Sequence, residues 1–298
     1  MNCQEVYKLI LYKTQTNIMK KILFLLLLIT CIVNAQTNLK YDKRNVQCED
    51  KWVAFQMNKD STYSFGFIYI DSMAGLTFNY QGRFKIINNV FVIQKGNDSN
   101  VNVKVRLTPS RVAVAEIPED RFKELNIEKY PDWLKVYKGN ENSIERLYRW
   151  GFLYNGWGEC AKALTYLEKA KEQQPNFKGL RVELAFSYNC MGKFDKAVTE
   201  LQASLAENPK DAYVYKELIY AQIKSGQLDK AAETCAKATK ICEDKKYNGE
   251  NCYNLLVAYF TNKDKAKFSQ WLDETKKWTA DNTLFTKNVN AMEAELKK

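Results

Sequence analysis

The sequence repeats itself every 34 residues between Ile144 and Glu243. Each repeat has a glycine followed five residues later by an alanine; these pairs are Gly158–Ala163, Gly192–Ala197 and Gly226–Ala231. Pro175 and Pro209 are also 34 residues apart. A fixed period of this length is typical of helical units that stack on their neighbours and share a continuous core. The repeat therefore predicts a binding scaffold, without naming what is bound.

The units resemble the tetratricopeptide repeat, a helix–turn–helix of 34 residues. The large, small and aromatic positions of that family are occupied in the first unit by Leu147, Trp150, Gly151, Tyr154, Ala163, Leu167, Ala170 and Pro175. The resemblance implies units at 144–177, 178–211 and 212–246. It further implies a degenerate unit at 247–280, in which Ala266 corresponds to Ala231 after one inserted residue, and a capping helix at 282–297.

In this family the first helices of successive units line a groove that holds a peptide or a partner's helix. The corresponding positions are Tyr148, Phe152, Asn155, Val182, Phe186, Asn189, Tyr213, Lys216, Tyr220 and Ile223. The family's best-known variant clamps a terminal carboxylate with lysine and asparagine, but Tyr148/Phe152 and Val182/Phe186 stand at those positions. The resemblance thus implies an aromatic groove for a protein or peptide partner. The chain's own sheet domain or terminal helix could instead fill it.

Residues 36–139 are typical of a β-rich domain with short helices at its end. Segments of aromatic and β-branched residues, and a period-two alternation from Val101 to Leu107, predict about six antiparallel strands. Gln81-Gly82 is interpreted as a hairpin turn between two of them. The polar segment Gly139–Ser143 predicts a boundary before a helical array at 140–298. The expected fold class is α+β: a small antiparallel sheet followed by an all-α tetratricopeptide solenoid.

Residues 1–35 have the layout of a secretory signal peptide. Lys20 and Lys21 precede an apolar run from Ile22 to Val33, and Ala35 is the small residue for cleavage before Gln36. Met19 is then a candidate for the true start. The segment ending at Cys31 also resembles a lipobox, which would anchor the protein to a membrane through that cysteine. We expect an exported protein, periplasmic or secreted, with a lipoprotein as the alternative and membrane contact only if Cys31 is lipidated.

The chain contains no histidine. Histidine-dependent catalytic triads and imidazole metal sites are therefore excluded, and we expect no metal, no cofactor and no enzymatic activity. The formal charge is +10, but lysines are mixed with acidic residues along the helices. This mixture is typical of solvated helix faces and does not favour a nucleic-acid partner.

Cysteines outside the leader lack CxxC spacing, which argues against zinc, whereas export would permit disulfides. Cys242 and Cys252 would end and begin consecutive antiparallel helices, so we expect a bridge between them. Cys160 and Cys190, near one end of adjacent helices, are a second candidate pair. Cys235 is interpreted as a buried core residue.

These features favour a non-catalytic protein-interaction scaffold outside the cytoplasm. The alternative is a ligand-binding module whose β domain holds a glycan or lipid, with the repeats as a spacer. The first would bind its partner through the groove, and the second through aromatic side chains of the sheet.

Overall fold

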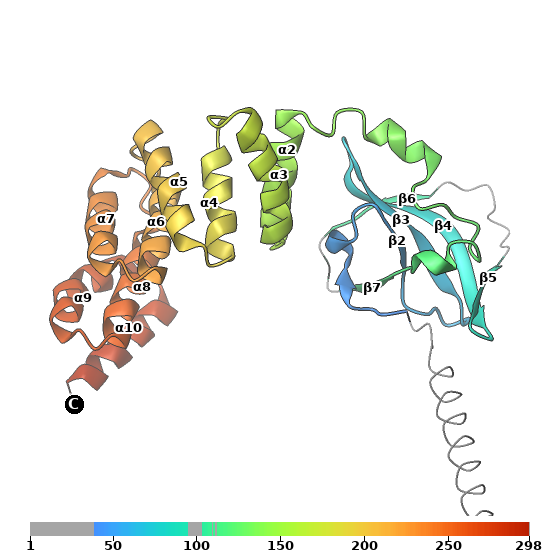
Figure 1. The fold of residues 1–298 in the computed structure, drawn as a ribbon. Helices are drawn as coiled ribbons and strands as arrows, with labels where there is room; N and C mark the ends of the chain where they lie inside the picture. The colour runs from blue at the N-terminus through green and yellow to red at the C-terminus, as the bar shows by residue number, and fades with distance from the viewer. Residues whose placement is uncertain (1–38, 95–102, 109, 111, 298) are drawn as a thin grey trace, which may run out of the picture. The chain divides into compact units, whose positions relative to one another are not determined.

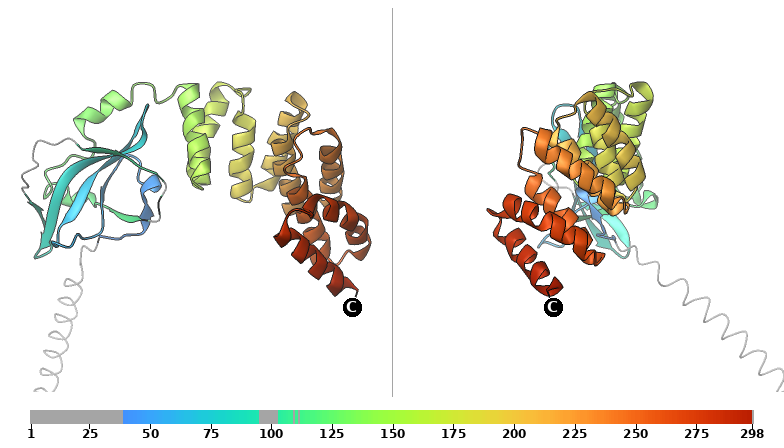
Figure 2. Two further views of the ribbon diagram at one scale, coloured as in Figure 1. Left: turned by 180° about the vertical axis from the view of Figure 1, so that it is seen from behind. Right: turned by 90° about the vertical axis from the view of Figure 1, so that its left-hand side faces the viewer.

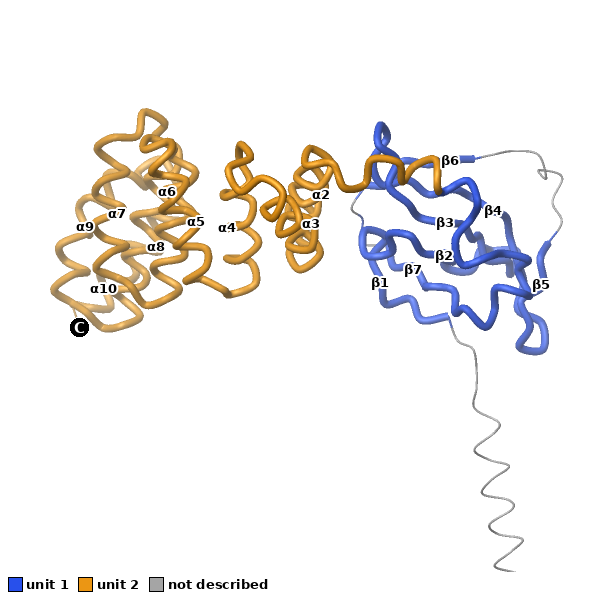
Figure 3. The backbone as a smooth tube through the Cα atoms, turned by 45° about the horizontal axis from the view of Figure 1, so that its top comes forward, with its two compact units in different colours: residues 1–134 blue, residues 135–298 orange. Residues whose placement is uncertain are grey.

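The computed structural model describes residues 39–94, 103–108, 110 and 112–297. Two compact units divide the chain between Leu134 and Lys135 (Figure 3). The first holds an antiparallel sheet and the second a series of helices, which confirms the expected α+β class. The segments expected to form the signal peptide and the lipobox lie outside the described residues.

The first unit is one sheet in which every described strand pair is antiparallel. Its order is β1-β7-β2-β3-β4-β5, and β6 pairs with another part of β4. The strands are β1 (Lys43–Arg44), β2 (Lys51–Ala54), β3 (Tyr63–Asp71), β4 (Gly75–Ile87), β5 (Val90–Gln94), β6 (Lys104–Arg106) and β7 (Ala113–Glu116). The described part of the sheet thus has seven strands where about six were expected.

Strand β4 runs straight through Gln81-Gly82, so the expected hairpin turn there was wrong. The pairing with β3 shifts register here, because Phe65 pairs with Gly82 and Gly66 pairs with Tyr80. Gln81 is therefore the extra residue of a bulge in β4, which does not reverse the chain. The first part of β4 then pairs with β6 and its last part with β5. One long strand therefore replaces two short ones.

Aromatic side chains fill the core of this unit. Trp52 meets Phe67 edge to face at 5.0 Å, and Phe84 stacks on Phe91 at 4.6 Å between ring centroids. The indole N–H of Trp52 donates to the carbonyl of Glu128 at 2.7 Å, so the buried ring has a polar partner. The unit ends in the short 3₁₀ helices η2 (Glu119–Arg121) and η3 (Asp132–Tyr137), the second of which crosses into the helical unit.

The second unit is a row of helix pairs, one pair for each expected repeat (Figures 1 and 2). The pairs are α2 (Ile144–Gly156) with α3 (Cys160–Gln173), α4 (Leu180–Cys190) with α5 (Phe194–Glu207), α6 (Ala212–Lys224) with α7 (Leu228–Ile241), and α8 (Asn248–Thr261) with α9 (Lys265–Thr279). A last helix, α10 (Thr283–Leu296), packs on α8 and α9. Among the described helices, none combines the length and apolarity required to span a bilayer.

The turns between paired helices explain the repeated glycine. Gly158, Gly192 and Gly226 have φ of 75°, 71° and 78°, a left-handed conformation that glycine adopts without steric cost. In the fourth unit Lys263 takes this conformation, with φ of 58°.

The expected register of the fourth unit was wrong. Helix α9 begins 37 residues after α7 begins, so Phe268 occupies the position of Ala231 and is buried, whereas Ala266 is exposed. The connection before α8 (242–247) is two residues longer than the one before α6 (208–211), and α8 is one residue longer than α6. These three insertions account for the shift from 34 to 37.

One disulfide joins Cys160, at the start of α3, to Cys190, at the end of α4. The expected bridge between Cys242 and Cys252 is not formed, and both thiols are free and buried. The physical reason is orientation: the sulfur of Cys252 points into the core, 3.7 Å from the sulfur of Cys235. Cys242 caps the end of α7.

Candidate functional site

The first helices of the units, α2, α4, α6 and α8, are neighbours in the row. A repeated polar contact joins α2 to α4 and α4 to α6. The side-chain amide of Asn155 donates to the backbone carbonyl and to Oε2 of Glu183, both at 2.9 Å. Asn189 donates in the same way to Glu217, at 3.2 and 3.0 Å. Each asparagine thus binds a glutamate 28 residues later, in the first helix of the next unit.

These contacts change the role expected for Asn155 and Asn189. Both were predicted to face a partner, but they are buried, with 4% and 5% of their surface exposed. Their amide groups are occupied within the chain. In this structure they hold consecutive units together, and the glutamates are the groups that they position.

The Asn155–Glu183 and Asn189–Glu217 contacts differ in one neighbouring side chain, which donates a hydrogen bond to the asparagine oxygen in the first contact only. The Oδ1 atom of Asn155 accepts a hydrogen bond from the hydroxyl of Ser187 at 2.6 Å. Thirty-four residues after Ser187 stands Ala221, which has no donor, and Oδ1 of Asn189 is buried without a hydrogen-bond partner among the described residues. The second contact is therefore less completely satisfied than the first.

A pocket of about 230 Å³ opens on three of the first helices, and we call it the central pocket. It is lined by Phe186, Asn189 and Cys190 of α4, Lys216, Glu217 and Tyr220 of α6, and Glu250 and Asn254 of α8. Four of the predicted groove residues thus meet there: Phe186, Asn189, Lys216 and Tyr220. Because its walls come from three units, this pocket exists only when the units are stacked.

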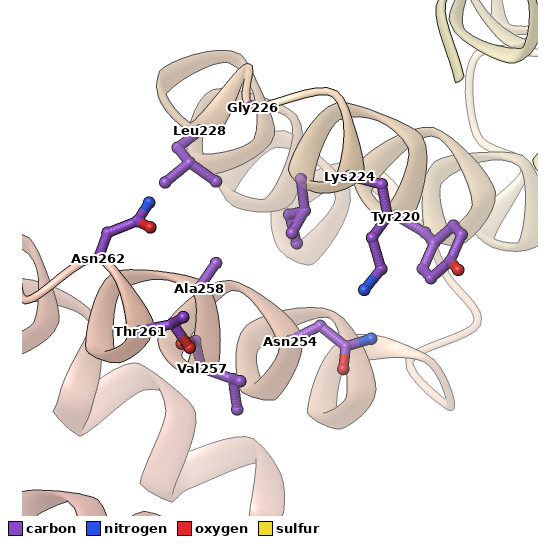
Figure 4. A pocket seen from close by; sticks show the side chains of 10 residues that line it. Tyr220, Lys224, Gly226, Leu228, Asn254, Val257, Ala258, Thr261 and Asn262 are labelled. Atoms are coloured by element: carbon purple, nitrogen blue, oxygen red, sulfur yellow. The ribbon is translucent and has the colours of Figure 1, made fainter. Parts of the chain in front are cut away.

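A second pocket of about 400 Å³, the end pocket, continues along α6 and α8. Figure 4 shows Tyr220 and Lys224 on one side of it, with Asn254, Val257 and Ala258 on the other. It also contains the predicted residue Ile223. Tyr220 and Asn254 line both pockets, so the two form one continuous surface along α6 and α8.

The remaining predicted residues line neither pocket. The ring of Tyr148 packs against Phe177 at 5.2 Å between centroids, and Tyr213 packs against Tyr247 at 5.9 Å. Val182 is half-buried, and Phe152 is 51% exposed on α2. These side chains lie on α2, α4 and α6, outside the two pockets.

Negative charge dominates the middle of this surface. Burial raises the pKa of Glu183, the hydrogen bond from Asn155 opposes that effect, and the charge of Glu217 raises the pKa further. Burial raises the pKa of Tyr213 as well, and the charges of Glu217 and Glu183 add to the increase. The carboxylates therefore create a negative potential that their neighbours experience.

Lys216 of the central pocket offsets part of this charge. The ammonium of Lys216 lies 3.3 Å from Oε1 of Glu217 and 3.8 Å from Oε1 of Glu250. It also lies over the rings of Tyr213 and Tyr247, at 5.5 and 5.7 Å from their centroids. The pocket thus already accommodates one cation between carboxylates and aromatic rings.

Sequence reasoning missed Glu183, Glu217, Glu250 and Asn254. The first two carry a signal, because they are 34 residues apart and each follows a repeated asparagine by 28 residues. The other two lie in α8. Aligning the fourth unit with the third by the expected shift of 35 residues does not match Glu250 and Asn254 with the pocket positions of α6. A shift of 37 would have aligned Tyr259 with Gln222, the position of Tyr154 and Tyr188 in the first two units.

Comparison with known families agrees with this geometry. A family model described as a tetratricopeptide repeat matches residues 158–216 and 191–245. These matches cover α3 to α7, with the turns at Gly158, Gly192 and Gly226 and the pocket walls that α4 and α6 supply. Residues 158–245 are a series of tetratricopeptide repeats. Arrays of this family are protein-interaction scaffolds, which supports the same role for this chain.

Solved structures similar to the chain include further helical proteins. "MamA 41-end from Desulfovibrio magneticus RS-1" is 22% identical with a TM-score of 0.44, covering 51% of this chain and 84% of that one. The structure titled "Functional Characterization of Pseudomonas Aeruginosa pilF" is 18% identical with a TM-score of 0.41. The match covers 53% of this chain and 72% of that one. No curated protein matches the chain.

Proposed function

We propose that the protein is a non-catalytic scaffold that binds an extended segment of a protein partner through the central pocket. The observation that carries the proposal is the composition of that pocket, in which Phe186 and Tyr220 flank the carboxylates of Glu217 and Glu250. Aromatic side chains in concave sites contribute strongly to protein binding when a partner covers them.

The charge of the pocket selects the kind of segment. Lys216 is shared between two carboxylates, and no described cation pairs with Glu183. A lysine or arginine of the partner would compensate the excess negative charge. The same charge disfavours a terminal carboxylate or a nucleic-acid phosphate in this position. We therefore propose a partner segment that carries basic side chains.

The glycan or lipid hypothesis for the β domain has less support. Trp52, Phe65, Phe67, Phe84 and Phe91 are buried against one another, so they are core residues and not an exposed binding face. A pocket beside Trp52, Glu116 and Phe122 measures only about 20 Å³, which is about the space of one water molecule. We assign the β domain a structural or secondary contact role.

We further propose that the scaffold works outside the cytoplasm, in the periplasm or after secretion. The basis is the basic and apolar layout of residues 1–35. The intact mass of the protein recovered from its host tests this. A chain beginning at Gln36 supports export with cleavage after Ala35, and a chain beginning at an acylated Cys31 supports the lipoprotein alternative. A retained leader contradicts both.

The binding proposal is tested by panning random phage-displayed peptides against the full chain and measuring the affinity of a selected peptide by fluorescence anisotropy. We expect selected peptides to be enriched in lysine and arginine, with affinity that falls as salt rises. Phe186→Ala and Tyr220→Ala should each weaken binding about tenfold or more, as losses at central aromatic anchors do. Tyr130→Ala, at an exposed tyrosine of the sheet unit, is the matched control.

Three results would contradict the proposal. Recovery of acidic peptides would show that the charge argument is wrong. Affinities that are unchanged in both pocket variants would place binding elsewhere. Failure to select any peptide would indicate that the surface is not a site for extended segments.

A further inference from the structure

Two thiols face each other in the core shared by the last units. Cys235 of α7 and Cys252 of α8 have their sulfur atoms 3.7 Å apart, and neither residue is exposed to solvent. They belong to one buried cluster with Tyr215, Leu255 and Leu256. The sulfurs are about 1.6 Å further apart than in a disulfide, whose bond length is close to 2.05 Å.

Both cysteines replace larger residues of the repeat. Cys235 stands 34 residues after Leu201 and 68 after Leu167, and both of these leucines are fully buried. Cys252 lies nine residues before the end of α8, as Tyr215 lies nine residues before the end of α6. The junction between the third and fourth units is thus the place where two large core side chains are both exchanged for cysteine.

Replacing two large core side chains by cysteine lowers the stability of the folded protein, and a covalent bond between the two cysteines would offset that loss. Smaller side chains at buried positions forfeit contacts and leave residual volume, which destabilises a core. A disulfide between residues on consecutive helices restrains the unfolded chain and links the two units directly. A covalent link would be useful at this junction, because the spacing between equivalent helices changes there from 34 to 37 residues.

We propose that Cys235 and Cys252 form a second disulfide, made during folding by exchange with a low-molecular-weight disulfide such as oxidised glutathione. One cysteine thiolate attacks the reagent and releases one thiol, giving a mixed disulfide. The second cysteine then attacks the protein sulfur of that bond and releases the second thiol. Overall, the protein loses two S–H bonds and gains one S–S bond. The S–S bond of the reagent breaks, and its two sulfurs take up two electrons and the two protons to become thiols.

The timing follows from the environment of the pair. The adjacent Cys252 thiol and burial both raise the pKa of Cys235, so the thiolate needed for exchange is scarce once the helices have packed. Exchange therefore precedes complete packing of α8 on α7. A native reduced sample should oxidise much more slowly than a refolding one.

The test is to refold the full chain with reduced and oxidised glutathione, block free thiols with iodoacetamide, digest with trypsin and analyse the peptides without reduction. Cleavage after lysine places Cys235, Cys242 and Cys252 in the separate peptides 231–237, 241–245 and 247–263. We expect 231–237 linked to 247–263, with 241–245 alkylated. Cys242→Ser should leave this link intact.

Recovery of 231–237 in alkylated form, or a link from 241–245 to 247–263, would overturn the proposal. A second readout uses a Cys160→Ser/Cys190→Ser background, which removes the first disulfide. Adding a phosphine reductant should lower its urea midpoint, and the further changes Cys235→Ala and Cys252→Ala should abolish that sensitivity. A midpoint that does not respond to reductant in this background would also contradict the bond.

Discussion

The amide of Asn189 in α4 donates to the carboxylate of Glu217 in α6 at 3.0 Å, repeating the contact that an asparagine and a glutamate make 34 residues earlier. The bond connects consecutive units and positions a buried carboxylate in the wall of the central pocket. It therefore couples the stability of the stack to the shape of the proposed binding site.

Asn189→Ala should lower the free energy of unfolding by about 1–3 kcal/mol, because it leaves the buried Glu217 carboxylate without this donor. Urea denaturation followed by circular dichroism measures the loss. Asn290→Ala, at an exposed asparagine of α10, should stay within about 0.5 kcal/mol of wild type. Equal losses in the two variants would contradict a specific role for the bond.

Ala221→Ser should stabilise the protein by about 0.5–1 kcal/mol, since its hydroxyl can donate to Oδ1 of Asn189 as Ser187 donates to Asn155. The reverse change, Ser187→Ala, should destabilise by about 1 kcal/mol or more. Thermal and urea unfolding of both variants provide the comparison. If Ala221→Ser destabilises, the pocket around Asn189 has no room for the hydroxyl.

Replacing Cys160 and Cys190 together by serine should cost roughly 3–4 kcal/mol, the chain-entropy expectation for a bridge with a sequence separation of 30. Urea midpoints without reductant measure the difference. The bridge also ends in the wall of the central pocket, so peptide affinity should fall in the same variant. Unchanged stability and affinity would mean that the bridge constrains neither property.

Glu183→Gln should raise stability at pH 7. The pKa of Glu183 is raised in the folded chain by burial and by Glu217, so the folded state binds this proton more tightly than the unfolded state. Such a group favours folding at low pH, and its contribution is lost as the pH rises through the folded pKa. The advantage of the variant should therefore shrink as the pH falls towards about 4, near the ordinary pKa of glutamate.

Urea midpoints of wild type and Glu183→Gln between pH 4 and 8 test this dependence. Glu172→Gln, at an exposed position of α3, is the control. A constant difference across the range would assign the effect of Glu183→Gln to packing and not to charge.

The helical array could be predicted from the amino-acid sequence, because the small residues and turn glycines needed for close helix pairs recur every 34 residues. Gly151 shows why: a side-chain carbon there would lie 2.3 Å from Leu167 of the paired helix. The same reasoning determined an antiparallel sheet from its aromatic and β-branched segments, and it identified Phe186, Lys216 and Tyr220 at the central pocket.

The polar groups that face the pocket and the sulfurs that lie close together could not be predicted, because they depend on how the helices pack. Asn155 and Asn189 match groove positions in the repeat, yet each has its amide committed to a glutamate that is 28 residues away in sequence and adjacent in space. Cys252 has Cys242 as a near neighbour along the chain, but it faces Cys235, because a helix directs each side chain by its angle around the axis. Periodicity places residues on elements, whereas contacts depend on how those elements are rotated and stacked.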